Sequence, residues 1–251
     1  MIVLCTNDDG RDALGLRTLM RAAAPLGDVW TVAPDREQSA TSHSLTLDRP
    51  LRVGSRRRRQ YHVDGTPTDC VLLAVHELMD RPPEVVLSGV NHGANMGEDV
   101  LYSGTVAAAM EATLLGIPAV AVSYVGEDAD AIEGFEPLLR ALLRTLVVRT
   151  DFPRDALFNV NLPVRSPEEV VGVRFTRLGR RVYSESITRR LDPAGREYYW
   201  IGGGEIRWSG PEDADFRAVE AGYVSVTPLH LDLTHGRLLE TVARWSLDLH
   251  G

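Results

Sequence analysis

The chain opens with Met1-Ile2-Val3-Leu4-Cys5-Thr6-Asn7-Asp8-Asp9-Gly10, an apolar run that ends in two adjacent carboxylates. A short run of this kind predicts a buried strand with Asp8 and Asp9 at its carboxyl end. In open α/β sheets, ligands bind at this edge. Two neighbouring negative charges repel each other, so a folded protein tolerates them best in water or around a cation. A solvated Asn-Asp-Asp-Gly turn is the competing interpretation, because these residue types favour turns by themselves.

A helix and a second strand follow the first strand. Apolar residues recur at helical spacing from Leu14 to Ala23, and Pro25 and Gly27 end the pattern. Val29 to Ala33 predicts the second strand, and the resulting βαβ unit implies a parallel sheet with a right-handed crossover. Later strands are expected at residues 85–88, 117–123 and 157–162, with helices between them. The predicted fold class is therefore α/β with a mostly parallel sheet.

The composition is that of an ordinary globular protein, with 44% hydrophobic and 25% charged residues among 251. The net charge of -8 argues against broad nucleic-acid or membrane binding. Cys5 and Cys70 lie in apolar stretches without metal-type spacing, so we expect reduced core thiols. No stretch reaches transmembrane length, and the early Asp8-Asp9 pair argues against a signal peptide. A soluble, cytoplasmic protein is expected.

An arginine run, Arg56-Arg57-Arg58-Arg59, separates two segments predicted as exposed or edge strands, residues 45–53 and 60–63. The run is most simply the solvated tip of a hairpin. A nucleic-acid role is the alternative interpretation.

Three polar loops each follow a predicted strand. They span residues 7–10, 33–44 and 89–97, and they carry carboxylates, amide oxygens and hydroxyls. Because parallel strands end at the same edge of a sheet, we expect the three loops to converge. An all-oxygen set of this kind suits Mg²⁺ or Mn²⁺ rather than a thiolate-bound zinc. His43 and His92 also fall in these loops, where each either assists proton transfer or is structural.

Two helix starts are predicted by their capping residues. Thr66-Pro67-Thr68-Asp69 has an N-cap threonine, a proline in the first turn and a capping-box acid. Tyr102-Ser103-Gly104-Thr105 begins a second helix, where Ser103 is either an N-cap or a phosphate contact. A hard metal ion beside a phosphate-binding helix start favours hydrolysis of a phosphoryl group.

Several other enzyme classes lack their signature in this chain. There is no Gly-x-x-x-x-Gly-Lys-Ser/Thr loop, no Gly-x-Gly-x-x-Gly spacing after the first strand, and no Gly-x-Ser-x-Gly elbow. A nucleotide-binding or sensory protein that never hydrolyses its ligand remains an alternative. So does a protein that acts through assembly alone, with a vestigial site.

After Pro163 the pattern changes to polar residues alternating with apolar or aromatic ones, which predicts long antiparallel hairpins. We expect a catalytic core over residues 1–165, an extended β-hairpin region over 166–210, and a C-terminal strand and helix over 211–251, the helix at 238–249. The last unit returns to the core or packs on a partner subunit. Isolated hairpins are only marginally stable, so the aromatic faces need a partner. A homodimer, or a homotetramer, built through these hairpins is expected, and the alternative is that the hairpins fold back on their own domain.

Six motifs, in order, resemble those of the stationary-phase survival protein SurE family. They are Thr6-Asn7-Asp8-Asp9-Gly10, Val32-Ala33-Pro34-Asp35, Ser39-Ala40-Thr41-Ser42-His43-Ser44, Gly65-Thr66-Pro67-Thr68-Asp69-Cys70, Ser88-Gly89-Val90-Asn91-His92-Gly93-Ala94-Asn95 and Tyr102-Ser103-Gly104-Thr105-Val106. The resemblance covers nearly the whole chain, including Asn159-Val160-Asn161-Leu162-Pro163 and the hairpin region. It implies a Rossmann-like three-layer core with a C-terminal antiparallel β-hairpin extension that mediates dimers and often tetramers.

The resemblance also implies an activity: divalent-metal-dependent hydrolysis of nucleoside 5′-monophosphates by a 5′-nucleotidase. Nucleoside 3′-monophosphates are the alternative substrates. By motif match, the ligands of one Mg²⁺ or Mn²⁺ per subunit would be Asp8, Asp9, Ser39 and Asn91. The substrate-facing residues would be His43, Asn95, Ser103, Gly104 and Thr105.

Asp8 and Asp9 are the expected catalytic residues. They would hold a cation that activates water, or one of them would attack phosphorus to give an aspartyl-phosphate. Ser42 is a local departure, because family members often carry glycine before the histidine.

Overall fold

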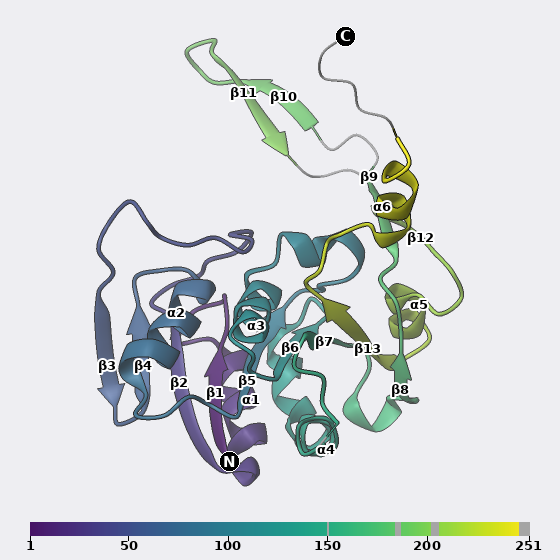
Figure 1. Ribbon diagram of the computed structural model, residues 1–251. Helices are drawn as coiled ribbons and strands as arrows, with labels where there is room; N and C mark the ends of the chain where they lie inside the picture. Colours follow the sequence, from purple (N-terminus) through teal and green to yellow (C-terminus); the bar gives the residue numbers. More distant parts are fainter. Residues whose placement is uncertain (150, 184–186, 202–205, 246–251) are drawn as a thin grey trace.

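The computed structural model describes residues 1–149, 151–183, 187–201 and 206–245 (Figure 1). A nine-stranded sheet lies at its centre, in the order β3-β4-β2-β1-β5-β6-β7-β13-β8. All neighbours are parallel except two pairs, β3 with β4 and β13 with β7. The strands are β1 (Ile2–Thr6), β2 (Asp28–Pro34), β3 (Val53–Arg57), β4 (Gln60–Val63), β5 (Val85–His92), β6 (Ala119–Tyr124), β7 (Ala156–Leu162), β8 (Gly172–Phe175) and β13 (Tyr223–His230). The prediction of a mostly parallel α/β sheet is confirmed.

The order of the strands places a switch point at β1. From β1 the chain builds outward through β2 to β4 on one side, and it then builds β5, β6 and β7 on the other. Ligand-binding crevices form where the strand order reverses in this way, outside the carboxyl ends of the strands. The Asp8-Asp9 pair follows β1 directly, at this position.

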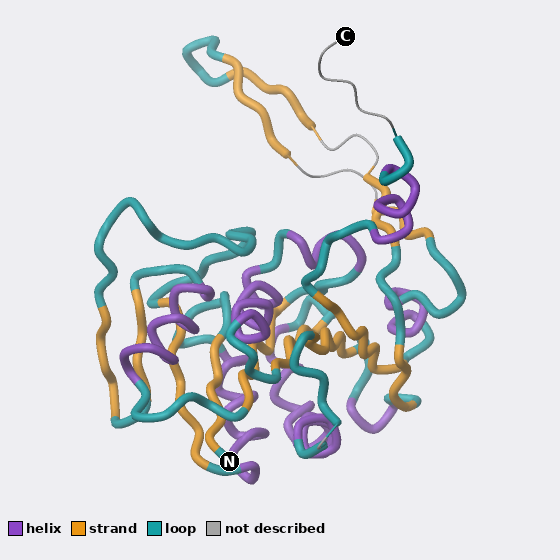
Figure 2. The backbone as a smooth tube through the Cα atoms, in the orientation of Figure 1, coloured by secondary structure: helices purple, strands orange, loops and turns teal. Residues whose placement is uncertain are grey.

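Helices cover both faces of the sheet (Figure 2). Alternation along β1 divides the core, because Val3 and Cys5 belong to one buried cluster and Leu4 to the other. The first cluster includes α1 and α4, and the second includes α2 and α3. The helices are α1 (Leu14–Ala23), α2 (Pro67–Leu73), α3 (Gly104–Leu114), α4 (Glu136–Val147), α5 (Asp215–Glu220) and α6 (Gly236–Val242), with a π-helical turn at η2 (Ala74–Leu78) and 3₁₀ turns at η1 (Ala24–Leu26), η3 (Gly97–Leu101), η4 (Ala129–Phe135) and η5 (Pro167–Glu169).

Two local predictions are confirmed in detail. The hydroxyl of Thr66 accepts the Asp69 amide at 3.1 Å, and the Asp69 carboxylate accepts the Thr66 amide at 2.8 Å, which completes the capping box of α2. Cys5 and Cys70 are free and buried, and burial raises the pKa of the Cys5 thiol to about 12. Among the described residues, no helix is long and apolar enough to cross a membrane.

The strand predicted at residues 45–53 is wrong. Residues 45–52 form no strand, and β3 starts only at Val53 and runs into the arginine run. The chain before it is held instead by Asp64, whose carboxylate accepts the Arg52 amide at 2.7 Å and pairs with Arg49 at 3.3 Å. Pro50 lies between these arginines and has no amide for a ladder. The hairpin predicted around the arginine run is present as β3 and β4.

Beyond residue 165, two of the described strands join the central sheet and four form separate antiparallel pairs. β8 and β13 are part of the nine-stranded sheet, whereas β9 (Arg180–Tyr183) pairs with β12 (Ile206–Ser209), and β10 (Ile187–Leu191) pairs with β11 (Glu197–Ile201). Both extra pairs are antiparallel, as predicted, and β10–β11 projects away from the core (Figure 1). The predicted closing helix corresponds to α6, and residues 246–251 lie outside the described residues.

Candidate active site

Asp8 and Asp9 lie where three loops and one helix meet. Asp8 is 4% exposed, and its carboxylate accepts a hydrogen bond from the hydroxyl of Thr105 on α3. Its backbone oxygen accepts the amide of Gln38, from the loop after β2, at 2.8 Å. The Asp9 carboxylate accepts the amide of His92, at the end of β5, at 3.1 Å. The structure therefore joins the loops after β1, β2 and β5 at this pair.

Burial makes it costly to ionise both carboxylates. It is the main cause that raises the pKa of Asp8, while hydrogen bonds from Thr105 act in the opposite direction. The pKa of Asp9 is raised to about 6, first by burial and then by the neighbouring charge of Asp8. Glu37 adds a further negative charge that raises the pKa of both groups. A divalent cation between the carboxylates would relieve this repulsion.

The first turn of α3 approaches Asp8 more closely than any residue with a side chain would allow. A Cβ on Gly104 would lie 2.9 Å from the Cβ of Asp8 and 3.1 Å from the hydroxyl oxygen of Thr41. Glycine at this position therefore lets the helix start, the end of β1 and the loop after β2 come together.

Ser103 is the N-cap of α3, because its hydroxyl oxygen accepts the amide of Val106 at 3.1 Å. The proton of the same hydroxyl remains available for donation. First-turn amides such as that of Gly104 have no partner inside a helix, and the helix dipole favours an anion beside them. Ser103 can therefore cap the helix with its hydroxyl oxygen and contact an anion with its hydroxyl proton.

The loop after β2 is docked on α3. The amide of Ser42 donates to the backbone oxygen of Tyr102 at 3.1 Å, and His43 Nε2 lies 2.7 Å from Glu111 Oε2. Ser42 has φ 53°, in the left-handed region that glycine adopts without strain. Ser39, by contrast, is exposed, and its hydroxyl donates to Glu37 at 2.6 Å.

Of the two asparagines expected in the site, Asn91 lies near the end of β5, which extends to His92, and Asn95 lies in the loop after it. Asn91 donates its side-chain Nδ2 to the backbone oxygen of Gly93 at 2.7 Å, so its Oδ1 remains available as an acceptor. Asn95 is almost fully buried and donates its side-chain amide to Ser123 at 2.8 Å. Its backbone is also fixed, because its amide donates to Asn161 and its carbonyl accepts from Asn159 and Asn161.

Several residues that build the site were not assigned by the sequence. Glu37 and Glu111 carry no motif signal, since they acquire their roles by spatial contact with Ser39 and His43. Asn159 and Asn161 did carry a sequence signal, because two asparagines at a spacing of two in an apolar strand lie on one face of it. Both are fully buried in the structure. Asp215 is also buried, and it accepts the amides of Gly97 and Gly179, which ties the loop before α3 to the C-terminal part of the chain.

The donor atoms fit a hard divalent cation. Among residues 1–149, 151–183, 187–201 and 206–245, no cluster of three or more His, Cys, Asp or Glu could hold a metal ion. The candidate set is of another kind, with two carboxylates supplemented by hydroxyl and amide oxygens. In the same described part of the chain, the buried Oδ1 of Asn7 has no hydrogen-bond partner, an unsatisfied oxygen next to the pair. The candidate set consists of oxygen donors, which hard divalent cations prefer.

Comparison with known proteins identifies the family. The family model described as "Survival protein SurE" matches residues 3–185. A protein of Gemmatimonas aurantiaca named 5′-nucleotidase SurE is 58% identical over 248 residues, covering 98% of each chain. One of Geotalea uraniireducens with the same name is 46% identical over 247 residues, covering 98% of this chain and all of the other.

The fold is similar as well. The crystal structure of the SurE protein from Aquifex aeolicus superimposes with a TM-score of 0.86 at 41% identity, and it covers 96% of this chain and 98% of the other. Sequence and structure agree over nearly the whole length, so the chain belongs to the SurE family.

Proposed function

We propose that this protein is a divalent-metal-dependent phosphomonoesterase, a 5′-nucleotidase that releases phosphate from nucleoside 5′-monophosphates. The observation that carries the proposal is the contact between Thr105 and Asp8, which joins a helix start suited to phosphate with a carboxylate pair suited to a cation. The names of the similar proteins support the same activity. A nucleoside 3′-monophosphate is a second substrate class for the same site.

In this proposal Asp8, Asp9, Ser39 and Asn91 hold one Mg²⁺ or Mn²⁺ per subunit. When bound, the cation would neutralise charge on the phosphate oxygens and favour attack on phosphorus. Asp8 and Asp9 supply the negative charge, and the hydrogen bonds from Thr105 and His92 fix the orientation of their carboxylates. Asn91 contributes the oxygen that its bond to Gly93 leaves available. Ser39 contributes its hydroxyl oxygen, whose proton is already donated to Glu37.

The phosphate-binding side consists of Ser103, Gly104 and Asn95. Ser103 offers a hydroxyl proton, Gly104 a first-turn amide, and Asn95 the second proton of an amide whose first proton is donated to Ser123. The hydroxyl of Thr105 is engaged by Asp8, so we propose that Thr105 positions the carboxylate as well as flanking the phosphate. His43 faces the substrate side, held by Glu111.

We further propose that the protein assembles through β10–β11 into a homodimer, and that two dimers form a tetramer. Large apolar side chains are exposed on both strands, at Ile187, Leu191, Tyr199, Trp200 and Ile201. Because successive residues of a strand point to opposite faces, Trp200 and Ile201 leave apolar surface on both faces of this ribbon. A two-stranded ribbon with such faces gains stability from a partner that covers them. The free, buried Cys5 and Cys70 agree with the reducing cytoplasm as its location.

The activity is tested by assaying phosphate release from a panel of nucleoside monophosphates with Mg²⁺, Mn²⁺ or a chelator. We expect metal-dependent release from 5′-monophosphates, and loss of most activity in Asp8→Asn and Asp9→Asn with the fold retained. Nucleotide binding without any phosphate release, under every metal, would instead identify a nucleotide-binding protein. Near-wild-type turnover of either variant at limiting metal would refute the assigned cation ligands.

A further inference from the structure

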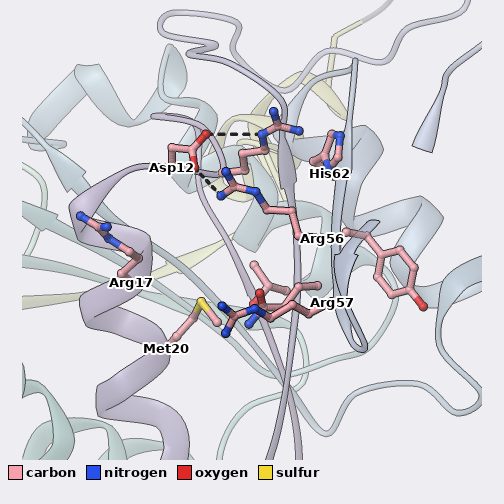
Figure 3. Close-up of a pocket in the computed structure, with 10 residues that line it drawn as sticks. Asp12, Arg17, Met20, Arg56, Arg57 and His62 are labelled. Carbon is pink, nitrogen blue, oxygen red and sulfur yellow. Dashed lines mark hydrogen bonds and ion pairs between the residues drawn. The ribbon is translucent and has the colours of Figure 1, made fainter. Parts of the chain in front are cut away.

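A cavity of about 600 Å³ lies between α1 and the β3–β4 hairpin, at the opposite end of the loop that begins with Asp8 and Asp9. Figure 3 shows Arg17 and Met20 on the helix side, and Arg56, Arg57 and His62 on the hairpin side. Arg11 and Asp12 close it from the loop between β1 and α1. Its volume is within the range of ligand pockets, roughly 300–1,000 Å³.

The cavity has a surplus of positive charge. Four arginines line it, Arg11, Arg17, Arg56 and Arg57, against the single carboxylate of Asp12. Asp12 is shared between Arg11, at 3.4 Å, and Arg56. Within the described part of the chain, Arg17 and Arg57 pair with no carboxylate. Three positive charges thus remain uncancelled in a protein whose net charge is -8.

A β-bulge directs two consecutive arginines into the same cavity. Neighbouring residues of a regular strand point to opposite faces, so Arg56 and Arg57 would normally diverge. The β3–β4 register shifts between Ser55 and Arg57, which leaves Arg56 as an extra residue on its strand. Bulges of this kind re-aim side chains, often next to functional sites. The convergence of these arginines is therefore built into the backbone rather than being a chance of flexible side chains.

His62 on β4 also lies in the cavity, and its surroundings disfavour a further positive charge. The pKa of His62 is lowered mainly by burial and then by Arg11; Arg56 adds to this, while Asp35 and Asp12 oppose it. In the described residues, its buried Nδ1 has no hydrogen-bond partner. An anion bound among the arginines would offset the positive charges of Arg11 and Arg56 and would therefore raise the pKa of His62.

We propose that this cavity binds a compact anion with at least two linked phosphate groups, as in inorganic diphosphate or a nucleoside diphosphate. Guanidinium groups bind phosphate oxygens in pairs of parallel hydrogen bonds, and three uncancelled charges match a diphosphate better than a single phosphate. A cavity of this size on an acidic protein suits a small anion better than a nucleic-acid strand, which needs an extended basic surface. The site is separate from the carboxylate pair, because none of the cation ligands proposed above lines it.

The test measures diphosphate binding by isothermal titration calorimetry on the full-length protein at fixed ionic strength. Arg57→Gln is compared with Arg58→Gln, which removes the same charge from the same arginine run but does not line the cavity. We expect diphosphate to bind about tenfold more weakly to Arg57→Gln, as for one lost hydrogen-bonded charge pair, and with little change to Arg58→Gln. Orthophosphate should bind the wild type more weakly than diphosphate.

Three controls separate this site from others. Asp9→Asn should keep diphosphate binding, and Arg57→Gln should keep phosphomonoesterase activity. The His62 ring resonances should show a pKa that rises when diphosphate is added. A comparison of inorganic with adenosine diphosphate distinguishes the two sources, since tighter binding of the nucleotide identifies additional contacts. Equal losses in Arg57→Gln and Arg58→Gln, loss of binding in Asp9→Asn, no measurable binding, or tighter binding of a single-stranded oligonucleotide through the same arginines would each overturn the proposal.

Discussion

The hydroxyl of Thr105 donates a hydrogen bond to the carboxylate of Asp8, and this contact connects the first turn of α3 with the end of β1. The two elements are distant in sequence, and they suit ligands of opposite charge. The helix start suits an anion, whereas the strand end presents two carboxylates. A cation and a phosphate bound here would be neighbours, because the groups proposed to hold them are already in contact.

Thr105→Val should weaken the cation site before the phosphate site. The substitution keeps the branched shape but leaves the buried Asp8 carboxylate without its hydroxyl donor, which costs about 1.5–3 kcal/mol for a charged acceptor. It also removes an interaction that lowers the pKa of Asp8. We expect the metal concentration for half-maximal activity to rise by about tenfold or more. Thr105→Ser retains the hydroxyl and should remain close to wild type in the same metal titration.

Ser103→Ala provides the complementary measurement for that experiment. It removes a proton donor on the phosphate side, so KM and the inhibition constant of phosphate should rise while metal dependence stays constant. If both variants shifted metal affinity equally, Ser103 would belong to the cation site.

Gly104→Ala should remove most of the activity while leaving the fold intact. The added methyl group would lie 2.9 Å from the Asp8 Cβ, so either the helix start or the carboxylate must move. A displacement of about 1 Å near the reacting groups is expected to cost about 100-fold in kcat. Gly236→Ala is the matched control, because no atom lies within 4 Å of its added Cβ. Circular dichroism verifies the fold, and full activity of Gly104→Ala would contradict the close packing.

The structure brings together the strand ends that the sequence predicted to converge, whereas the roles of the residues there stay predictions. Asp8 and Asp9 follow a recognisable buried strand, and the parallel sheet brings the loop after β2 to them through the Gln38 amide. The contacts made by side chains across the fold were not predictable. Nothing local in the sequence indicates that Glu111 binds His43, or that Asp215 holds the amides of Gly97 and Gly179.

The wrong prediction of a strand at residues 45–52 also results from side-chain contacts across the fold. Its alternating apolar residues fit a strand, but Leu47 is 87% exposed, and tertiary contacts with Asp64 fix the segment as a loop. Local propensity was overridden by an ion-pair and hydrogen-bond network that only the folded chain creates.

Without a divalent cation, the ionisation of Asp9 should make stability decrease as pH rises from about 4 to about 6. The pKa of Asp9 is about 6 in the folded protein and near 3.9 in an unfolded chain, so the folded state binds more protons in this range. Stability then falls with increasing pH, by up to about 3 kcal/mol for a two-unit difference. A cation requires the ionised carboxylate and should therefore stabilise the protein more as pH increases.

Thermal unfolding in chelator from pH 4 to 7.5, for wild type and Asp9→Asn, measures this effect. Other carboxylates titrate in both proteins, so the difference between the two reports on the Asp9 position. Wild type should lose stability relative to Asp9→Asn as pH rises, and added Mg²⁺ or Mn²⁺ should reverse the difference near pH 7. A constant difference across the range would show that Asp9 is not held in a destabilising environment.

Shortening the projecting hairpin should reduce the size of the assembly without loss of the core. Ile187 and Ile201 face each other across β10–β11, and Trp200 lies beside them with 66% of its surface exposed. Replacing residues 187–201 by a short Gly-Ser turn removes this apolar surface while leaving the nine-stranded sheet untouched. Light scattering at micromolar concentration should then show a smaller species than wild type. The double variant Trp200→Ser/Ile201→Ser should weaken assembly, whereas Leu47→Ser/Leu233→Ser, which changes residues elsewhere that are at least as exposed, should not. A wild-type protein that is already monomeric at this concentration would rule out assembly through the hairpin.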